Sequence, residues 1–256
     1  MLYVVDIVLD KLPGLLMTQS NPHQQTLGSS NSSQSNLEKK QAEREHIKQN
    51  LLDQIDRLHT QYKTVPNSPI TNLDLETQEL EDLNAAIAAV EAVTPYPEPL
   101  LQGIQLLNAN WVLRYSDARE ITSLSSRTQF GLQLGAVYQK INVDALSFEN
   151  RAYVQHQWSC IAGSVAVTAR FEPAPQPEAG QNRRINVIFE KRSLSISKLL
   201  GLKTPFLDPF KVIQVTPPKD RTPCLDITYL DQDLRIGRGG NGSLFVLTKS
   251  QPQAAV

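Results

Sequence analysis

The residues best suited to acid–base chemistry are Asp231 and Asp233, two positions apart near the C-terminus. On a β-strand, residues i and i+2 point to the same face, so these carboxylates would be neighbours. Two like charges in a cleft raise the pKa of one carboxyl group, as a general acid requires. The adjacent turn and the nearby Arg235 and Arg238 instead favour ion pairs and hydrogen bonds from backbone donors. We therefore expect both aspartates to have a structural role.

Other catalytic and metal-binding patterns are incomplete. Ser195-Ile-Ser-Lys198 matches the Ser-x-x-Lys start of a penicillin-binding-type nucleophile, but the companion Ser-Asp-Asn and Lys-Thr-Gly motifs are missing. None of the four histidines has metal-ligand spacing to a carboxylate or another histidine. Cys160 and Cys224 lack a Cys-x-x-Cys spacing, which argues against a zinc site and a disulfide framework. The sequence predicts a protein that is not an enzyme and has no cofactor or metal.

A cluster of glycines near the C-terminus has the spacing of a dinucleotide-binding motif, Gly-x-Gly-x-x-Gly, at Gly237, Gly239 and Gly242. That motif requires a helix N-terminus directly after the glycines, to receive the pyrophosphate. Here a β-branched and aromatic run follows, Ser243–Leu247. Asn241-Gly242 supplies the positive φ angles of a tight turn, so the segment predicts a β-hairpin with Gly237 at a bulge.

Two amphipathic helices are expected before the β-rich part of the chain. A capping box at Ser35-x-x-Glu38 precedes apolar residues at spacings of three and four that run to Tyr62. A second helix is expected over 75–93, and Thr94-Pro-Tyr-Pro-Glu-Pro99 ends it because proline has no backbone donor. Residues 18–36 are rich in Ser, Asn and Gln and should be disordered.

The first seventeen residues are apolar but contain Asp6, Asp10 and Lys11, and no segment of the chain reaches the length of a membrane-spanning helix. On a helix this segment would present one apolar face, which permits interfacial membrane contact. An upstream extension, with translation starting at Met17, is the equally weighted alternative.

Beyond Pro99 the spacing of apolar residues changes from near 3.6 to near 2, which predicts strands. The expected strands are 110–116, 136–143, 164–171, 184–190, 211–215, 225–229 and 243–247, with two more over 145–150 and 153–160. A short helical insertion is expected over Ser195–Gly201. Eight or nine short alternating strands with turn-length connections predict an antiparallel meander that closes on itself and leaves room for one small ligand.

The C-terminal string from Asp226 to Leu247, with Asp-Gln-Asp-Leu-Arg-Ile-Gly-Arg-Gly at its centre, closely resembles the signature of the plastid lipid-associated proteins, or fibrillins and plastoglobulins. Pro95-Tyr-Pro-Glu-Pro99, Trp111-Val-Leu-Arg-Tyr-Ser116 and Val137-Tyr-Gln-Lys-Ile-Asn142 match as well. The resemblance covers roughly residues 80–249. Its signature residues here are Asp226, Tyr229, Asp231, Asp233, Arg235, Arg238, Gly239 and Gly242.

This resemblance implies a mainly β fold, a lipocalin-like antiparallel β-barrel preceded by two amphipathic helices and a disordered tail. The expected divisions are a tail over 1–36, a helical region over 37–94 and the barrel over 95–250. The resemblance also implies a structural or photoprotective role at thylakoids or lipid bodies. The N-terminus is unlike a plant transit peptide, which suggests a cyanobacterial-type member on the cytoplasmic face of the thylakoid membrane.

Aromatic residues within or beside the expected strands are candidates for the lining of an apolar cavity. Alternation sends about half of them inward, and the register decides which half. They either fill a small barrel or line a pocket for an isoprenoid, quinone, carotenoid or acyl lipid. The candidates are Trp111, Tyr115, Tyr138, Phe148, Trp158, Phe171, Phe189, Tyr229 and Phe245.

Lipocalins close one end of the barrel with a tryptophan on the first strand, covered by an arginine from the last strands. The matching residues here are Trp111 and either Arg235 or Arg238, so we expect one guanidinium to stack on the indole in a cation–π contact. The segment 107–111 departs from the family pattern, which has glycine two positions before the tryptophan.

Charge is divided unevenly along the chain. Residues 38–99 carry twelve acidic and six basic side chains, and residues 100–256 carry eighteen basic and twelve acidic ones. The acidic helices either dock on the basic part or leave a basic face for anionic headgroups. Candidates for a membrane-facing surface are Arg183, Arg184, Lys191, Arg192, Lys198 and Lys203.

The partners expected are an apolar ligand and a peripheral membrane surface, and the aromatic pattern does not indicate nucleic acid. The alternative is a protein-interaction module with a filled barrel, whose acidic helices recruit an enzyme of isoprenoid or quinone synthesis.

Overall fold

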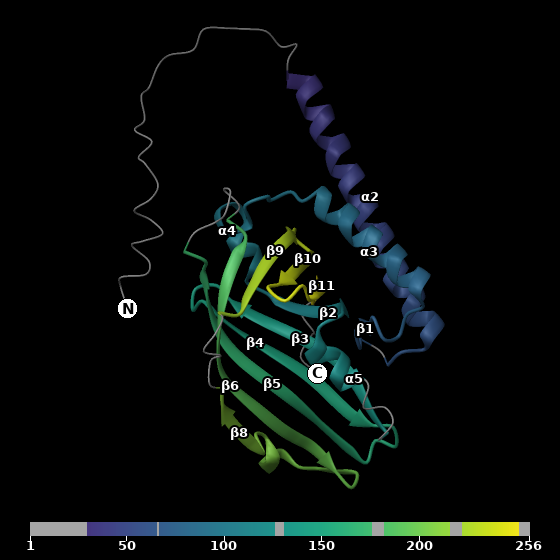
Figure 1. Cartoon of the computed structure of the whole chain (residues 1–256), viewed down its shortest axis with the longest axis vertical. Helices are drawn as coiled ribbons and strands as arrows, with labels where there is room; N and C mark the ends of the chain where they lie inside the picture. The colour runs from purple at the N-terminus through teal and green to yellow at the C-terminus, as the bar shows by residue number, and fades with distance from the viewer. Residues whose placement is uncertain (1–29, 66, 126–130, 176–181, 216–221, 251–256) are drawn as a thin grey trace. The chain divides into compact units, whose positions relative to one another are not determined.

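The computed structural model describes residues 30–65, 67–125, 131–175, 182–215 and 222–250, and shows a mainly β protein with an eleven-stranded sheet (Figure 1). The helices are α2 (Ser30–Tyr62), α3 (Thr77–Ala92), α4 (Pro99–Gln102) and α5 (Arg119–Ser125), with 3-10 turns η1 (Ile104–Leu107) and η4 (Pro205–Leu207). The strands are β1 (Ile70–Thr71), β2 (Asn110–Ser116), β3 (Leu132–Asn142), β4 (Ser147–His156), β5 (Ile161–Pro173), β6 (Arg184–Leu199), β7 (Leu202–Lys203), β8 (Lys211–Gln214), β9 (Cys224–Leu230), β10 (Leu234–Gly239) and β11 (Leu244–Lys249).

Helix α2 begins at Ser30, five residues before the predicted capping box. Residues 30–36, which we expected in a disordered tail, are therefore helical, because extending an existing helix costs little per residue. The chain divides into two units at a boundary within α2, between Ala42 and Glu43. Side chains 34–43 are all exposed. The apolar segment 1–17 lies outside the described residues.

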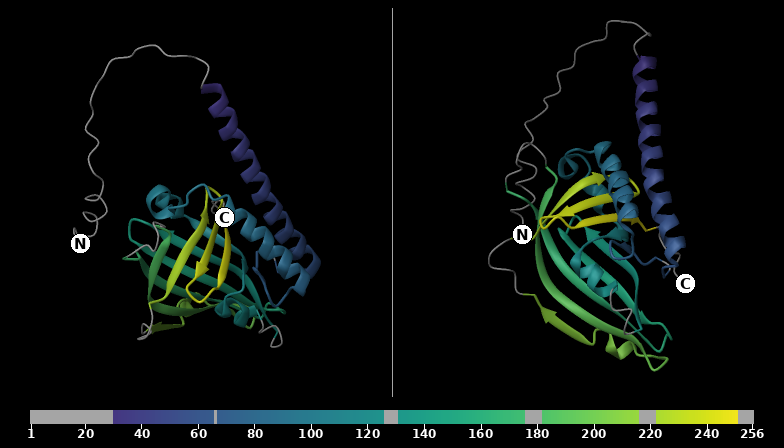
Figure 2. Two further views of the ribbon diagram at one scale, coloured as in Figure 1. Left: turned by 45° about the horizontal axis from the view of Figure 1, so that its top comes forward. Right: turned by 45° about the vertical axis from the view of Figure 1, so that its right-hand side comes forward.

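The strands follow the order β1-β2-β11-β10-β9-β6-β5-β4-β3, and β3 also pairs with β2. The hydrogen-bonded path therefore returns to β2 through Asn110–Val112. The described pairings are antiparallel, as predicted, except for the parallel pair β1–β2. Figure 2 shows a strongly curved sheet, in which the yellow strands β9–β11 cross over the long teal and green strands.

Two expectations about the strands are wrong. The two strands expected over 145–160 are one strand, β4, which begins after a turn at Leu146, where φ is +46°. The helical insertion expected over Ser195–Gly201 is instead the continuation of β6 to Leu199, followed by a turn. Pairing of this segment with β5 and β7 satisfies its backbone groups and overrides the local signal.

The C-terminal glycines form the predicted hairpin. Strands β10 and β11 pair antiparallel, and the N–H of Gly242 donates to the carbonyl of Gly239 at 2.8 Å. Gly242 has a φ of +88°, which glycine adopts without strain. The predicted bulge is present as well, since the register between β9 and β10 shifts at Ile236/Gly237. Strand β11, not a helix, comes directly after the glycines, so the dinucleotide motif has no phosphate-binding context.

A helix-side core joins α2 and α3 to one face of β2, β9, β10 and β11. Leu51 and Ile55 of α2 are completely buried there, as are Leu83 and Ile87 of α3, which confirms the predicted apolar faces. The strand residues of this core are Ile70 of β1 and Tyr115, Tyr229, Leu234, Ile236, Leu244 and Val246.

Ion pairs also hold the helices on the sheet. Both side-chain oxygens of Glu91 in α3 accept from Arg238 of β10, each at 2.8 Å. Asp56 of α2 pairs with Arg114 of β2. Of the two roles considered for the acidic helices, these contacts support docking on the basic part of the chain.

Candidate functional site

A cavity of about 500 Å³ lies on the face of the sheet opposite the helix-side core. Its walls come from β2, β3, β4, β6, β9, β10 and β11, with α5 at one side. Most of the lining is apolar, including Leu113, Val137, Val187 and Leu247. A volume of this size falls within the range of small-molecule sites, about 300–1,000 Å³. We call this space the cavity.

Exposed residues mark where the cavity meets solvent. Glu120 of α5, Thr222 before β9, and Gly240 and Asn241 of the β10–β11 turn line the cavity and are exposed. Cys224, half-buried and with a free thiol, lies beside this mouth. The other cysteine, Cys160, is also free.

Five of the nine aromatic candidates lie at the cavity or directly beside it. Tyr138, Phe148, Phe189 and Phe245 line it. Phe171 is buried and stacks on Phe148, with ring centroids 6.4 Å apart, next to a smaller void of about 30 Å³.

Trp111 is completely buried at the inner end of this apolar region. Its Nε1–H donates to the carbonyl of Leu107 at 3.0 Å. The guanidinium of Arg235 lies over the indole, 5.4 Å from its centroid, so the expected cation–π contact is confirmed for Arg235. Arg238 pairs with Glu91 instead.

Tyr115 and Tyr229 lie on the opposite face, in the helix-side core, rather than at the cavity. Bulges are the physical reason, because one extra residue reverses the alternation of faces. On β2, Leu113 and Tyr115 pair with consecutive residues of β11, so one extra residue stands between them. On β9, Ile227 and Tyr229 likewise pair with consecutive residues of β10. Burial raises the pKa of the Tyr115 hydroxyl to about 12.

Trp158 is the third aromatic candidate that lies elsewhere. Strand β4 ends at His156, and Trp158 stands in the following turn with 78% of its surface exposed. Its indole contacts the His156 ring edge to face, with centroids 5.2 Å apart.

Arg235 is the charged group at the inner part of the cavity. It is only 3% exposed, and its Nη2 donates to the Oε1 of Gln139, whose Nε2 donates to Asn150 at 2.7 Å. All three residues line the cavity. Burial lowers the pKa of Arg235 to about 9, so the guanidinium is still protonated at neutral pH. Sequence reasoning missed Gln139 and Asn150, because only the paired register of β3 and β4 brings them opposite each other.

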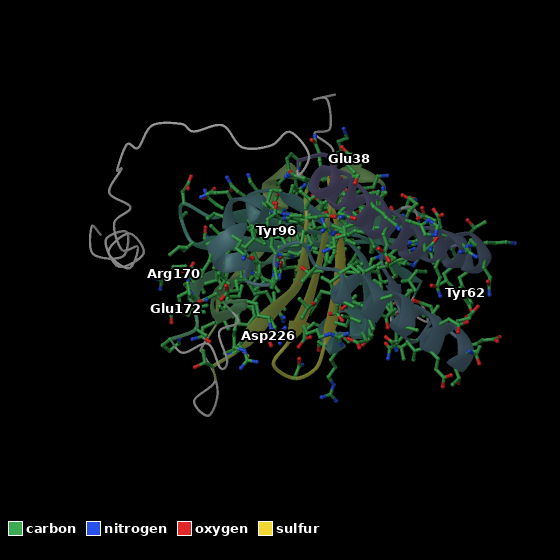
Figure 3. The ribbon with its side chains drawn as sticks, turned by 90° about the horizontal axis from the view of Figure 1, so that it is seen from above. Glu38, Tyr62, Tyr96, Arg170, Glu172 and Asp226 are labelled. Atoms are coloured by element: carbon green, nitrogen blue, oxygen red, sulfur yellow. The ribbon has the colours of Figure 1, made fainter. Side chains whose placement is uncertain are left out.

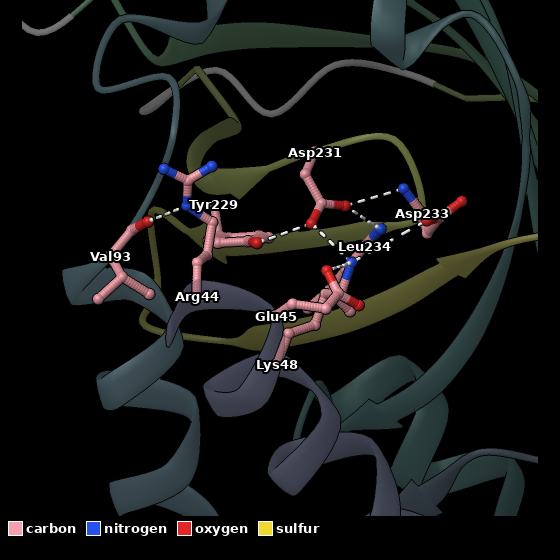
Figure 4. A network of polar contacts seen from close by, with 8 residues as sticks. All are labelled: Arg44, Glu45, Lys48, Val93, Tyr229, Asp231, Asp233 and Leu234. Atoms are coloured by element: carbon pink, nitrogen blue, oxygen red, sulfur yellow. Dashed lines mark hydrogen bonds and ion pairs between the residues drawn. The ribbon is translucent and has the colours of Figure 1, made fainter. Parts of the chain in front are cut away.

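Asp231 lies in a polar network on the side of the sheet that faces α2 (Figure 4). It accepts hydrogen bonds from the Tyr229 hydroxyl at 2.7 Å, from Lys48 Nζ at 3.1 Å, and from the backbone N–H groups of Asp233 and Leu234 at 2.8 and 2.7 Å. Although burial opposes ionisation, these donors outweigh it and hold the pKa of Asp231 below its usual value. Neither Asp231 nor Asp233 lines the cavity, and this network matches the structural role expected for them.

The basic candidates for membrane contact fall into two groups. Arg184 binds Asp226 of β9 through two hydrogen bonds of 2.7 and 2.8 Å, and neighbouring Arg183 also lowers the pKa of that carboxyl. Asp226 is labelled in Figure 3. The remaining four candidates belong to the segment β6–β7, where Lys198 lies directly opposite Lys203.

A set of exposed apolar side chains lies on the same segment, on both faces of this sheet edge, and sequence reasoning missed it. We call it the β6–β8 patch: Leu194, Leu199, Leu200, Leu202, Phe206, Phe210, Val212 and Ile213. The N–H of Gly201 donates to the carbonyl of Cys160 at 3.1 Å, and the exposed Ile161 lies opposite Leu199. The only sequence signal was the run of apolar residues between lysines, which also fits a buried strand.

Within the described ranges, no set of three or more His, Cys, Asp or Glu side chains is placed to hold a metal ion. None of the described helices has the length and apolar character needed to cross a bilayer.

Comparison with known proteins places this architecture in a family. The PAP_fibrillin family model matches residues 70–248. The chain is 27% identical over 203 residues to "Plastoglobulin-1, chloroplastic" of Pisum sativum, covering 66% of this chain and 54% of that protein. It is 28% identical over 197 residues to "Chromoplast-specific carotenoid-associated protein, chromoplastic" of Cucumis sativus, covering 64% and 58%.

A third relative, "Plastid-lipid-associated protein, chloroplastic" of Citrus unshiu, is 26% identical over 205 residues, with 69% of this chain and 62% of that protein covered. The chain thus spans only 54–62% of the length of these three relatives. Since the family model matches well over half of the sequence, the chain belongs to the plastid lipid-associated protein (PAP)/fibrillin family.

Proposed function

We propose that this protein is a non-catalytic lipid-binding protein, which holds an apolar ligand in the cavity and associates peripherally with membranes or lipid bodies. The cavity is the observation that carries the proposal. It is lined by Leu, Val and Phe side chains with few polar groups, a composition that suits an isoprenoid, quinone, carotenoid or acyl chain. The names of the relatives from Citrus and Cucumis, which refer to lipid and carotenoid association, support this reading.

The curvature of the sheet supports a lipocalin-like barrel as its architecture. The pairing of β3 with β2 returns the strand path to its start, so eight strands (β2, β11, β10, β9, β6, β5, β4 and β3) form a ring of hydrogen-bonded neighbours. A barrel of about eight strands is wide enough to hold one small ligand. The arginine over Trp111 is the kind of contact that closes one end of a lipocalin barrel.

The β6–β8 patch supports a peripheral membrane contact. Leu200, Leu202 and Phe206 are 81%, 72% and 79% exposed, and soluble proteins rarely leave such side chains together in water without a binding role. Lys198 and Lys203 are cross-strand neighbours, an arrangement of like charges that is unfavourable unless an anion lies nearby. Each basic residue near an anionic membrane contributes about 1 kcal/mol. This edge of the sheet therefore offers apolar side chains for insertion and basic groups for attraction to headgroups.

Flotation with liposomes tests this contact. The wild-type protein should float with vesicles that contain anionic lipid, and less with neutral vesicles or at high salt. Phe206→Asp should reduce flotation strongly, because it places a charge where the patch would enter the lipid. Leu73→Asp is the matched control, since Leu73 is equally apolar, 63% exposed and outside the patch. Equal flotation of both variants would refute the role of the patch.

Mass spectrometry of organic extracts from the purified native protein tests the ligand. A stoichiometric apolar molecule is the expected result. Val187→Trp, which would fill part of the cavity, should abolish co-purification of that molecule while circular dichroism stays unchanged. A protein that never carries or takes up an apolar molecule would contradict the proposal.

The alternative function, a protein-interaction module with a filled interior, has less support. It requires side chains to occupy the space that the cavity leaves open. The helices expected to recruit a partner use Leu83, Ile87 and Val90 to pack on the sheet. Co-purification of an isoprenoid-synthesis enzyme, together with absent flotation and absent ligand, would favour the module.

A further inference from the structure

The cavity contains one feature that an apolar ligand alone does not explain. Arg235, 3% exposed, lines both the cavity and the small void next to it. Among the described residues no carboxylate lies within 4.0 Å of its guanidinium, and its Nε has no hydrogen-bond partner. A buried cation without an anion is costly for a protein, since burial removes the hydration of the charge.

The contacts that Arg235 does make are neutral. Trp111 offers its ring face, and the amide oxygen of Gln139 accepts from Nη2. These contacts hold the guanidinium in place but leave its positive charge unbalanced. The arrangement is that of a preformed site for an anion, with a fixed donor fork and a rigid support.

The position of Arg235 sets the direction in which a ligand would lie. On β10, Arg235 is four residues from Gly239, and a strand rises about 3.4 Å per residue, so the two are about 14 Å apart. Gly239, Gly240 and Asn241 belong to the end of the cavity that meets solvent. Between the two ends the walls are apolar, with Phe245, Phe189 and Leu225 among them. The geometry provides a charged inner end, an apolar middle and an open mouth.

We propose that the ligand is a long-chain carboxylate, such as a fatty acid, whose carboxylate binds Arg235 at the inner end while its chain extends toward the β10–β11 turn. This inference rests on the proposed lipid-binding function and narrows its ligand class. A neutral carotenoid or quinone would leave the Arg235 charge unbalanced. An acyl carboxylate satisfies the guanidinium and fills the apolar walls with one molecule.

Competition between two ligands of equal chain length tests the proposal. Nile red, a neutral polarity-sensitive dye, is bound to the wild-type protein and displaced by oleate or by oleyl alcohol. In a purely apolar cavity the alcohol should bind more tightly, because transfer of a carboxylate out of water is costly. With Arg235 as its partner, oleate should bind about 10- to 100-fold more tightly than oleyl alcohol.

Two variants on the same strand locate the effect. Arg235→Met should reduce or reverse the preference for oleate while Nile red and oleyl alcohol still bind. Arg238→Met is the matched control, because Arg238 pairs with Glu91 and does not line the cavity, and it should keep the preference. Loss of the preference in both variants, or in neither, would overturn the assignment to Arg235.

A measurement on the wild-type protein is independent of how the variants fold. The carbon-13 signal of carboxyl-labelled oleate reports its ionisation, and a guanidinium partner should hold the pKa of the bound carboxyl below that of oleate in solution. A raised pKa, or equal affinity for oleate and the alcohol, would refute the carboxylate site and leave the lipid-binding function standing. Failure of Nile red and both lipids to bind would refute the two proposals together.

Discussion

Replacement of Asp231 by alanine should destabilise the protein far more than replacement of Asp233, although the two carboxylates are neighbours in one turn. Asp231 accepts from four donors, and two of them, the Tyr229 hydroxyl and the Leu234 N–H, belong to residues with no exposed surface. A buried donor without a partner costs about 1–3 kcal/mol, so Asp231→Ala should lower the free energy of unfolding by about 2–6 kcal/mol. Lys48 keeps Glu45 as an ion-pair partner at 2.8 Å.

Asp233 provides the matched control. Its side chain is 75% exposed and lies 4.0 Å from Lys48, and exposed pairs of this kind contribute about 0–1 kcal/mol. Urea unfolding followed by circular dichroism measures both variants under one set of conditions. Equal losses in the two variants, or a loss below about 1 kcal/mol for Asp231→Ala, would show that the network does not anchor the turn as argued.

Three further predictions follow from the same contacts. The pKa of Asp231 lies below its ordinary 3.8, so the ionised carboxylate stabilises the fold fully above that value. This stabilisation is lost as pH falls through the pKa of the folded state. In acid unfolding, Asp231→Asn should therefore lack this pH-dependent loss of stability. Arg238→Gln removes the ion pair with Glu91 and should lower the free energy of unfolding by about 1 kcal/mol, and by less in high salt. Arg170→Gln, which removes the exposed pair with Glu190, should lower it by less. Urea unfolding measures both variants. Gly242→Ala places a side chain at φ +88° and should lower the melting temperature, with a loss of about 1 kcal/mol or more; an unchanged melting temperature would contradict the strain.

The strands were predictable because alternation over short runs is a local signal. Strand β2 matches the predicted 110–116, and β9 and β11 differ from their predicted bounds by one or two residues. The continuation of β6 through Ser195 was not predictable, since it depends on pairing with strands far along the chain. A mixed polar and apolar segment carries no local sign of such partners.

The candidate site was only partly predictable, and two extra residues explain much of the difference. Arg114 and Thr228 stand at the register shifts of β2 and β9, and each shift turns the following tyrosine toward the helices. A bulge has no reliable signature in a single sequence, so the faces of Tyr115 and Tyr229 could not be assigned. The resemblance predicted that either Arg235 or Arg238 lies over Trp111, and the structure shows that it is Arg235. The lack of a carboxylate partner for Arg235 became visible only in three dimensions.

The helix-side core and the cavity lie on opposite faces of the same strands, which explains how the fold can be stable and still contain a cavity. Eleven of the thirteen buried residues of the helix-side core have no exposed surface, and each such side chain contributes about 1.5–3 kcal/mol through its removal from water. The helices thus provide a dry core on the outer face of β2, β9, β10 and β11. The inner face of the same strands need not be filled for the fold to persist, so Phe245 and Leu247 are available to a ligand. It follows that substitutions on the two faces should have different effects. Substitutions in the helix-side core should lower the free energy of unfolding, and those at the cavity should weaken ligand binding.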